Sequence, residues 1–285
     1  MNDLSTLDRE AEQIVKEIGI PPCPAVLTKL LREMRDDEPD LERIGGWIGS
    51  DVSLAGAMLK TVNSAFYGLS TKATSVQEAL ALLGLGTVAR LITGLLLREA
   101  FPLSAHPMME SFWEKSSNVA NICAYLAPQL SGLATDEAYT FGLFRDCGIP
   151  IMIFKFTNYS RFYRKTQSTF GLPMTEVEDE LYKMDHARVG YQLAKSWHLD
   201  DDTCQSILAH HNDKILQLKN NSATLKNRQF VALGILAEQL FKEQISETEC
   251  PEWTEGKLLV LSTLNISDTE YRDWSTKIDK ILRLT

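Results

Sequence analysis

Cysteine is scarce in this sequence, and its distribution excludes two kinds of covalent framework. The 285 residues contain five cysteines with no CxxC pair among them, namely Cys23, Cys123, Cys147, Cys204 and Cys250. An odd number of widely spaced cysteines is typical of reduced thiols in a cytoplasmic protein. We therefore expect a cytoplasmic location, without a disulfide framework and without a structural zinc site built from cysteine.

The motifs of common nucleophilic and nucleotide-binding enzymes are also missing. The sequence has neither GxSxG, which marks a serine nucleophile, nor the GxxxxGK loop that cradles phosphates. No cysteine stands beside a histidine. The run GLG at residues 84–86 follows no strand pattern, so we interpret it as a joint between two helices rather than a dinucleotide-binding fingerprint.

Basic residues are fewer than acidic ones, and this limits the partners of the protein. The chain has 29 Lys and Arg against 38 Asp and Glu, which gives a formal net charge of −9 at pH 7. An acidic surface repels phosphate backbones, and the sequence shows no local basic patch. We therefore expect no binding to nucleic-acid polymers.

Long apolar runs are rare, and the longest one needs an explanation. Residues 79–97 are about long enough to span a bilayer, but they include Arg90 and three glycines, and ordinary helical patterns flank them. We interpret them as two buried core helices that meet at residues 84–86. The N-terminal residues are acidic and amphipathic, so we predict neither a signal peptide nor a membrane partner.

Helical periodicity dominates the rest of the chain. Apolar residues recur at helical spacing in most segments, whereas the strict alternation typical of strands is nearly absent. The run KLLVLSTL (residues 257–264) is short enough to be either helix or strand. The capping-box pattern S/T-x-x-E begins at Ser75, Thr175 and Ser267, each just before a helical pattern. The predicted fold class is all-α.

Two prolines close together mark the best candidate for a domain boundary in the chain. Pro102 and Pro107 both lie in FPLSAHPMMES, residues 101–111. No low-complexity tract or long polar linker divides the sequence elsewhere. We predict an N-terminal helical lobe over residues 1–105 and a C-terminal helical lobe over residues 106–285, packed together as one continuous structure.

Histidine is as scarce as cysteine, and three of the histidines stand at notable positions. The five are His106, His186, His198, His210 and His211. His186 stands where one helix should start, and the pair His210 and His211 stands where another should end. With Asp146 they form a nitrogen and oxygen set suited to Fe, Mn, Zn or Ni. Spacing does not show convergence, and the alternative is that helix dipoles or carbonyls satisfy these histidines separately.

The segment FRDCG, residues 144–148, sets Arg145 beside Asp146 at the end of an apolar helical pattern. A histidine in place of Arg145 would make a plausible pair of metal ligands. Arginine stays protonated at any ordinary pH and has no lone pair to donate, so Arg145 is excluded as a ligand. The pair therefore predicts a buried ion pair rather than half of a metal site.

Several longer motifs occur in one order along residues 15–215. They include PPCPAVLTKLL, NSAFYG, ALLGLGTVARL, FWEKSSNVA, FGLFRDCG, DHARVGYQLAKSW and ILAHHN. This series resembles the HDOD family, the HD-related output domains of bacterial signalling proteins. The resemblance implies a multi-helical HD-domain-like bundle with an N-terminal helical lobe packed on it. It also implies a role in signal transduction without phosphohydrolase activity.

HDOD domains are similar to HD-domain phosphohydrolases, which bind metals through helical His and Asp residues. The resemblance implies that Lys115 and Arg145 stand where those enzymes have histidines, that Asp146 is the retained aspartate, and that Glu238 replaces a late aspartate. We interpret these four residues as a degenerate HD site in which cations take the place of a metal. The resemblance also implies that His186, His210 and His211 match further ligand positions of the cyclic-dinucleotide-cleaving relatives.

The favoured function is a non-catalytic signal-transduction module, a stand-alone HDOD domain that binds a signalling protein partner or a small ligand. We expect no cofactor. The alternative is a metal-dependent phosphohydrolase acting on a nucleotide or cyclic dinucleotide, with one divalent Fe, Mn, Zn or Ni on Asp146, His186, His210 and His211. A third hypothesis is a nucleotide sensor in which Arg145 and Lys115 clamp a phosphate without cleaving it.

The segment NSAFYG, residues 63–68, is a candidate contact for a partner or ligand. It offers Asn63 and two neighbouring aromatic side chains, Phe66 and Tyr67, beside Gly68. The other interpretation, which we favour, is that both rings fill the core between the two lobes.

Overall fold

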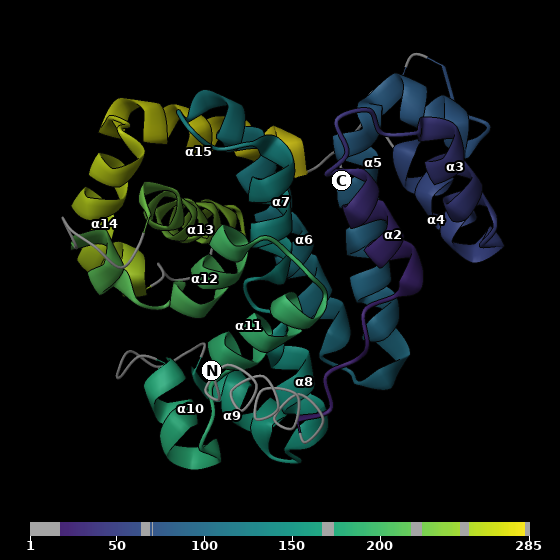
Figure 1. Ribbon diagram of the computed structural model, residues 1–285. Helices are drawn as coiled ribbons and strands as arrows, with labels where there is room; N and C mark the ends of the chain where they lie inside the picture. Colours follow the sequence, from purple (N-terminus) through teal and green to yellow (C-terminus); the bar gives the residue numbers. More distant parts are fainter. Residues whose placement is uncertain are drawn as a thin grey trace, which may run out of the picture.

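The computed structural model describes residues 18–63, 69, 71–166, 174–217, 224–245 and 251–282. Within these ranges every regular element is a helix, and no strand is present (Figure 1). This confirms the all-α prediction. The run at residues 257–264, which the sequence left open, lies in a helix.

The first group of helices stands apart on one side of the molecule in Figure 1. Its members are α2 (Ala25–Glu33), α3 (Leu41–Gly49), α4 (Val52–Val62) and α5 (Val76–Ala100). Helices α2, α3 and α4 all pack against α5. Asp40 and Asp51 fix the starts of α3 and α4, because each side chain accepts a hydrogen bond from a backbone N–H in the first turn.

Helix α5 is two helices joined at a glycine. Gly84 has φ 77° and ψ 162°, a conformation that L side chains rarely adopt, so the helical path breaks there. This confirms the joint predicted at residues 84–86. By length and composition residues 76–105 would suit a membrane span, but half of their apolar window is buried inside the protein. A core helix passes the same test, and we keep that interpretation.

The remaining helices form the larger group. They are α6 (Met109–Leu126), α7 (Thr135–Phe144), α8 (Gly148–Lys155), α9 (Tyr159–Thr166), α10 (Met174–Tyr182), α11 (His186–Ser196), α12 (Asp201–Ala209), α13 (Leu225–Gln244), α14 (Pro251–Leu264) and α15 (Asp268–Leu282). Short 3-10 helices lie at Leu103–Ala105, Ala127–Gln129 and Asp213–Gln217. Helices α6 and α7 pack together, and α11 packs against α8 and α12.

Helix α13 is the centre of this larger group. Residues 229–242 are buried without a break, so the helix is covered on every side along this stretch, including its polar residues Gln229, Glu238, Gln239 and Lys242. Helices α6, α12, α14 and α15 pack around it (Figure 1). Its Phe230 ring stacks on Phe141 of α7 with centroids 5.3 Å apart. Helices α7 and α12, which directly precede three of the four candidate ligands described below, also pack against α13.

Two of the three predicted capping boxes are helix starts. Ser75 accepts a hydrogen bond from Glu78 N at 3.1 Å, and Ser267 accepts one from Glu270 N at 3.2 Å. The third prediction is wrong, because α10 begins at residue 174 and Thr175 therefore lies inside the helix. The S/T-x-x-E pattern is short, and tertiary contacts decide where its glutamate goes.

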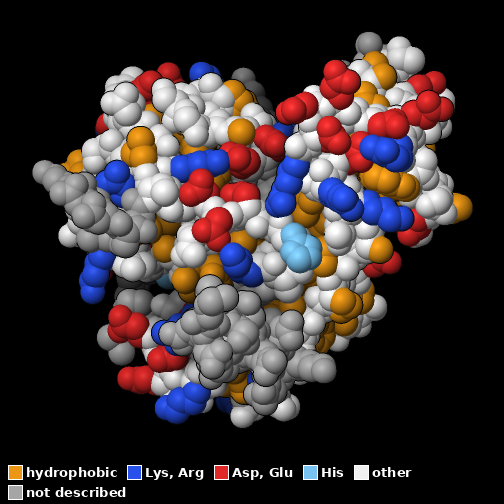
Figure 2. All heavy atoms as spheres, viewed as in Figure 1, with side chains coloured by type: hydrophobic (Ala, Val, Ile, Leu, Met, Phe, Trp, Pro, Cys, Tyr) orange, Lys and Arg blue, Asp and Glu red, His pale blue; other side chains and the backbone are white. Residues whose placement is uncertain are grey.

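The two groups of helices meet through α5 and α7 and through the segment before α2. The Trp197 indole N–H donates to the Pro21 carbonyl at 3.0 Å, and Arg35 Nη2 donates to the His198 carbonyl at 3.3 Å. On the face shown in Figure 2, acidic and basic side chains are interspersed, and several basic ones gather near this junction. The lobe boundary placed at residue 105 stays a prediction.

Candidate functional site

Three histidines and one aspartate converge in the larger group of helices. Asp146 follows α7, His186 opens α11, and His210 and His211 follow α12. One ligand atom from each of the four lies within 4.8 Å of the others. His186 Nε2 is 3.3 Å from His210 Nε2 and 3.1 Å from His211 Nε2. Asp146 Oδ1 is 3.2 Å from His210 Nε2. The structure thus brings together the four residues that the sequence suggested as ligands.

Helix ends place these side chains. Asp185 caps α11 by accepting from Arg188 N at 2.8 Å, which fixes His186 in the first turn. Asp200 caps α12 in the same way through Thr203 N at 2.8 Å. Helix α12 then ends at residue 209, so the two following histidines turn toward α11. The acidic cluster at residues 200–202 therefore includes a cap that supports the site.

Each of the three histidines is oriented by an acceptor at its Nδ1. The pairs are Glu178 Oε2 with His186 at 2.7 Å, the Ile207 carbonyl with His210 at 2.6 Å, and Glu252 Oε1 with His211 at 2.7 Å. An acceptor at Nδ1 places the proton on that nitrogen and leaves the Nε2 lone pair free. The three Nε2 atoms therefore present lone pairs to one shared space.

This donor set fits a divalent metal. Nε2 atoms 3.1–3.3 Å apart oppose their lone pairs unless a proton or a cation lies between them. Imidazole nitrogens with one carboxylate oxygen suit Fe, Mn, Zn or Ni, and histidine ligands are commonly braced by carboxylates and carbonyls as here. The buried group of Asp146, His186, His210 and His211 could therefore hold one such ion.

Two of the candidate ligands are held in the protonation state that a metal needs. Burial and the neighbouring His211 lower the pKa of His210 to about 3, so its imidazole is neutral at pH 7. Burial alone would raise the pKa of Asp146, but Arg145 and Lys115 outweigh it and hold that pKa well below its ordinary value. Metal ligands must be deprotonated, so both groups are ready to bind.

Glu178 is a site residue that sequence reasoning assigned to the wrong role. Its side chain is fully buried and accepts from the backbone N–H of His186 at 3.0 Å and from the Tyr159 hydroxyl. Burial would raise its pKa, but His186 outweighs this and lowers it, while Glu178 in turn raises the pKa of His186 against the effect of burial. Glu178 therefore braces a ligand instead of closing a capping box.

The four residues of the degenerate HD site form an ion-pair network on the other side of Asp146. Glu238 receives Arg145 Nη2 at 2.6 Å and Lys115 Nζ at 2.7 Å. Arg145 Nη1 donates to the Gly234 carbonyl at 2.8 Å. Lys115 Nζ and Arg145 Nε lie 3.7 Å and 3.8 Å from Asp146 Oδ2. One aspartate thus faces the histidines with one oxygen and the cations with the other.

This network is nearly closed to water and stays fully charged. The side chains of Arg145 and Glu238 are 4% and 10% exposed, and Lys242 adds a third cation 3.6 Å from Glu238. Burial acts against every charge here, yet the ion pairs outweigh it: the pKa of Glu238 is lowered, mainly by Lys115, and those of Arg145 and Lys115 are raised. The guanidinium is therefore a permanent cation beside Asp146.

Sequence reasoning missed Glu252 altogether and missed the supporting role of Glu178. Glu178 lies 8 residues before His186, and Glu252 lies 41 residues after His211. Neither spacing distinguishes a bracing carboxylate from a surface one.

Asn63, the first residue of the NSAFYG segment, exchanges two hydrogen bonds with the backbone of Ala73, each 2.8 Å long. Residues 66–68 of the NSAFYG segment, Phe66, Tyr67 and Gly68, lie outside the described residues, so both interpretations of that segment stay predictions.

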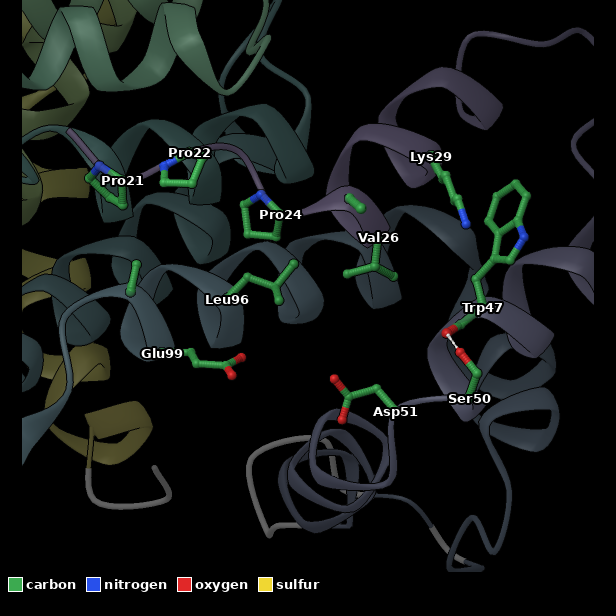
Figure 3. A pocket seen from close by; sticks show the side chains of 12 residues that line it. Pro21, Pro22, Pro24, Val26, Lys29, Trp47, Ser50, Asp51, Leu96 and Glu99 are labelled. Carbon is green, nitrogen blue, oxygen red and sulfur yellow. Dashed lines mark hydrogen bonds between the residues drawn. The ribbon is translucent and has the colours of Figure 1, made fainter. Parts of the chain in front are cut away.

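A groove of 540 Å³ lies in the smaller group of helices, away from the histidines. It is lined by parts of α2, α3 and α5 and by the prolines before α2 (Figure 3). The Glu99 and Asp51 carboxylates face one another across it, and Lys29 points toward Trp47. None of the candidate ligands lines this groove, so it is a separate feature of the molecule.

Family comparison agrees with this arrangement. A family model described as the HDOD domain matches residues 20–213. The chain belongs to the HDOD family. The HDOD match covers α2 to α12 and includes all four candidate ligands, whereas Glu238 and Glu252 on α13 and α14 lie beyond it. The resemblance seen in the sequence motifs is confirmed.

Two curated relatives contain a region similar to this HDOD chain. A protein of Treponema pallidum (strain Nichols) is 26% identical over 208 residues, which are 68% of this chain and 38% of the relative. YuxH of Bacillus subtilis (strain 168) is 29% identical over 227 residues, 79% of this chain and 46% of YuxH. The chain therefore spans less than half the length of these relatives.

Three solved structures share the HDOD fold. An HDOD domain protein with unknown function from Geobacter sulfurreducens has a TM-score of 0.70 and 19% identity, covering 99% of this chain and 97% of its own. A proposed signal transduction protein from Marinobacter aquaeolei VT8 has a TM-score of 0.74 and 18% identity, and the match covers 95% of this chain and 60% of that protein. A proposed phosphohydrolase from Shewanella amazonensis SB2B has a TM-score of 0.71 and 19% identity, and the match covers 94% of this chain and 93% of that protein. At such identities the likeness shows the fold alone.

Acid should weaken the protein partly through Glu252. Burial would raise its pKa, but the hydrogen bond from His211 outweighs this and lowers it to about 2. A lowered carboxyl pKa stabilises the folded state above the ordinary pKa and loses that contribution as the pH falls. In chelator-treated protein, wild type should have a larger free energy of unfolding than Glu252→Gln near neutral pH. This difference should shrink by up to about 1.4 kcal/mol per pH unit as the pH falls from about 4.5 to about 3. Urea unfolding measures this, and a constant difference would contradict it.

Proposed function

We propose that this HDOD chain is a non-hydrolytic signal-transduction module that acts by binding a signalling protein partner. We further propose that Asp146, His186, His210 and His211 bind one divalent metal as a structural element. The observation that carries the first proposal is the position of Arg145. Its guanidinium pairs with Glu238 and the Gly234 carbonyl beside Asp146. The resemblance implies that HD-domain phosphohydrolases have a ligand histidine at that position.

The geometry of the histidine group supports a structural role for its metal. Structural zinc sites are closed by four protein ligands, whereas catalytic sites keep one coordination position open for water or substrate. Three imidazoles and one carboxylate supply four ligands from three separate segments of the chain. A bound divalent ion can activate a water molecule when a position is open. Here the four side chains would instead join the end of α7 to α11 and α12.

A phosphohydrolase is the second candidate, and one observation favours it. The four ligands converge with neutral His210 and ionised Asp146, which is also the state that a catalytic metal requires. The Shewanella amazonensis structure with a similar fold is itself a proposed phosphohydrolase. A single metal acting on a nucleotide or cyclic dinucleotide would have to work beside two cations, Arg145 and Lys115, that lie within 4 Å of Asp146 Oδ2. That charge arrangement leads us to rank hydrolysis second.

The geometry weighs against the phosphate clamp. Arg145 uses Nη1 on the Gly234 carbonyl and Nη2 on Glu238, and Lys115 lies 2.7 Å from Glu238. A clamp needs donors that are free to turn toward a phosphate. These donors already serve buried protein acceptors, so a nucleotide ligand would have to displace them. Binding of a nucleotide at this point is therefore the weakest of the three hypotheses.

Metal content and turnover, measured together on untagged protein, test the proposal. We expect about one Fe, Mn, Zn or Ni per chain in wild type, at least tenfold less in His210→Ala, and no turnover of a panel of phosphodiesters and nucleotides. His198→Asn is the matched control, because His198 is exposed outside the group and asparagine tolerates its φ of 58°. It should keep the metal.

Three outcomes would change these conclusions. Turnover that disappears with the metal in His210→Ala would overturn the non-hydrolytic proposal and establish the second candidate. Wild-type protein without stoichiometric metal, even after refolding with each ion, would overturn the structural metal. Equal metal loss in His198→Asn and His210→Ala would show that the metal lies elsewhere.

A further inference from the structure

The helices beyond the HDOD match touch the metal group through Glu252. This residue lies in the first turn of α14, and its Oε1 is 2.7 Å from His211 Nδ1. We propose that Glu252 is the positioning residue for the ligand His211, so that metal binding and the docking of α14 stabilise each other. This inference rests on the metal binding proposed above and adds the means by which that site is coupled to the C-terminal helices.

His211 is the candidate ligand that most needs an external brace. Its side chain is 15% exposed, against 0% for His186, 2% for His210 and 8% for Asp146. His186 and His210 are braced by Glu178 and the Ile207 carbonyl, which both lie inside the family match at residues 20–213. The brace of His211 comes instead from α14. The least buried ligand therefore depends on a separate part of the chain.

Helix α14 is placed to respond to the position of His211. It packs on α13 and on the 3-10 helix Asp213–Gln217, which follows His211 almost directly. It also contacts α15. The centroids of the Trp253 and Tyr271 rings lie 4.7 Å apart, and Lys257 Nζ lies 2.6 Å from Asp268 Oδ1. A change at Glu252 would therefore act on both C-terminal helices.

Thermodynamic linkage makes the coupling reciprocal. If the Glu252 brace strengthens metal binding by some factor, bound metal must strengthen the docked state of α14 by the same factor. Loss of a carboxylate that braces a metal-ligating histidine typically costs about 10–100-fold in metal affinity. A coupling of that size is sufficient for the C-terminal helices to report whether the metal site is filled.

Hydrogen exchange and calorimetry on the full-length chain test this, with Zn²⁺ as the probe. In wild type, Zn²⁺ should slow amide exchange across residues 251–264. Glu252→Ala should bind Zn²⁺ about 10–100-fold more weakly and, at saturating Zn²⁺, should lose the slowing in α14. Glu252→Gln keeps an acceptor for the imidazole N–H, so it should fall between the two. Glu255→Ala, an exposed position on the same helix, is the matched control and should behave as wild type.

The outcomes separate this inference from the proposed function. Tight Zn²⁺ binding by wild type with equal affinity and equal α14 exchange in Glu252→Ala would overturn the coupling and leave the metal site standing. Absence of Zn²⁺ binding in wild type would overturn both. If Glu252→Ala loosens α14 even without metal, the calorimetric affinity still decides, because an unchanged affinity would overturn the role of Glu252.

Discussion

Gly148→Ala is expected to destabilise the protein by at least about 4 kcal/mol and to abolish metal binding. A Cβ atom at Gly148 would overlap the backbone carbonyl of His186 and lie 2.8 Å from Gly190 N. Both neighbours are backbone atoms of α11, so no side chain can rotate away. Relief requires α8 and α11 to separate, and α11 begins with the candidate ligand His186.

Chemical unfolding and Zn²⁺ titration measure this effect. Gly256→Ala is the matched control, because a Cβ there meets nothing within 4 Å and the residue lies inside α14. Alanine is the better helix former, so the control should be neutral or more stable by up to about 1 kcal/mol. A Gly148→Ala protein with the wild-type unfolding midpoint would contradict the close packing of α8 on α11.

Arg145→Met is expected to lower the free energy of unfolding by about 3–5 kcal/mol. Methionine nearly fills the space but removes the cation from the buried network. The Gly234 carbonyl loses the Arg145 donor, and Glu238 and Asp146 lose one of the cations that offset their burial. Lys115 remains 2.7 Å from Glu238, so the cost is that of an incomplete network rather than of two isolated charges.

Urea unfolding of three variants checks the Arg145 prediction. Arg145→Lys keeps the charge but loses the planar fork that reaches both Gly234 and Glu238, so its stability should lie between wild type and Arg145→Met. Lys195→Met removes an exposed ion pair with Asp201, whose N–O distance is 3.0 Å, and should change stability by less than about 1 kcal/mol. Equal stabilities for Arg145→Met and Lys195→Met would show that the buried network contributes nothing.

The fold class and several local features were predictable because they depend on neighbours along the chain. Helical periodicity gave the all-α class, and the glycine pair at residues 84–86 predicted a joint that Gly84 makes with its positive φ. The chemistry of arginine excluded Arg145 as a ligand without any coordinates. The order of motifs along residues 15–215 predicted the family that the match at residues 20–213 confirms.

The supporting residues of the site were not predictable in this way. Thr175 and Glu178 fit a capping box by spacing, but burial directs Glu178 to the Nδ1 of His186. Glu252 comes from a helix that starts 40 residues after the last histidine pair, at residue 251. Short-range patterns carry no information about such contacts, since the packing of α10 and α14 creates them.

The residue types alone establish which chemical groups are available: three histidines near helix ends, one aspartate, and an arginine and a lysine that do not act as ligands in their charged forms. The packing of the helices establishes which of these groups face the histidine cluster and which face the ion-pair network. Asp146 turns one oxygen toward three Nε2 atoms and the other toward two cations, because α7, α11 and α12 meet at that point. Charge and lone pairs are properties of residue type, whereas distances of 3–4 Å between remote residues arise only from packing.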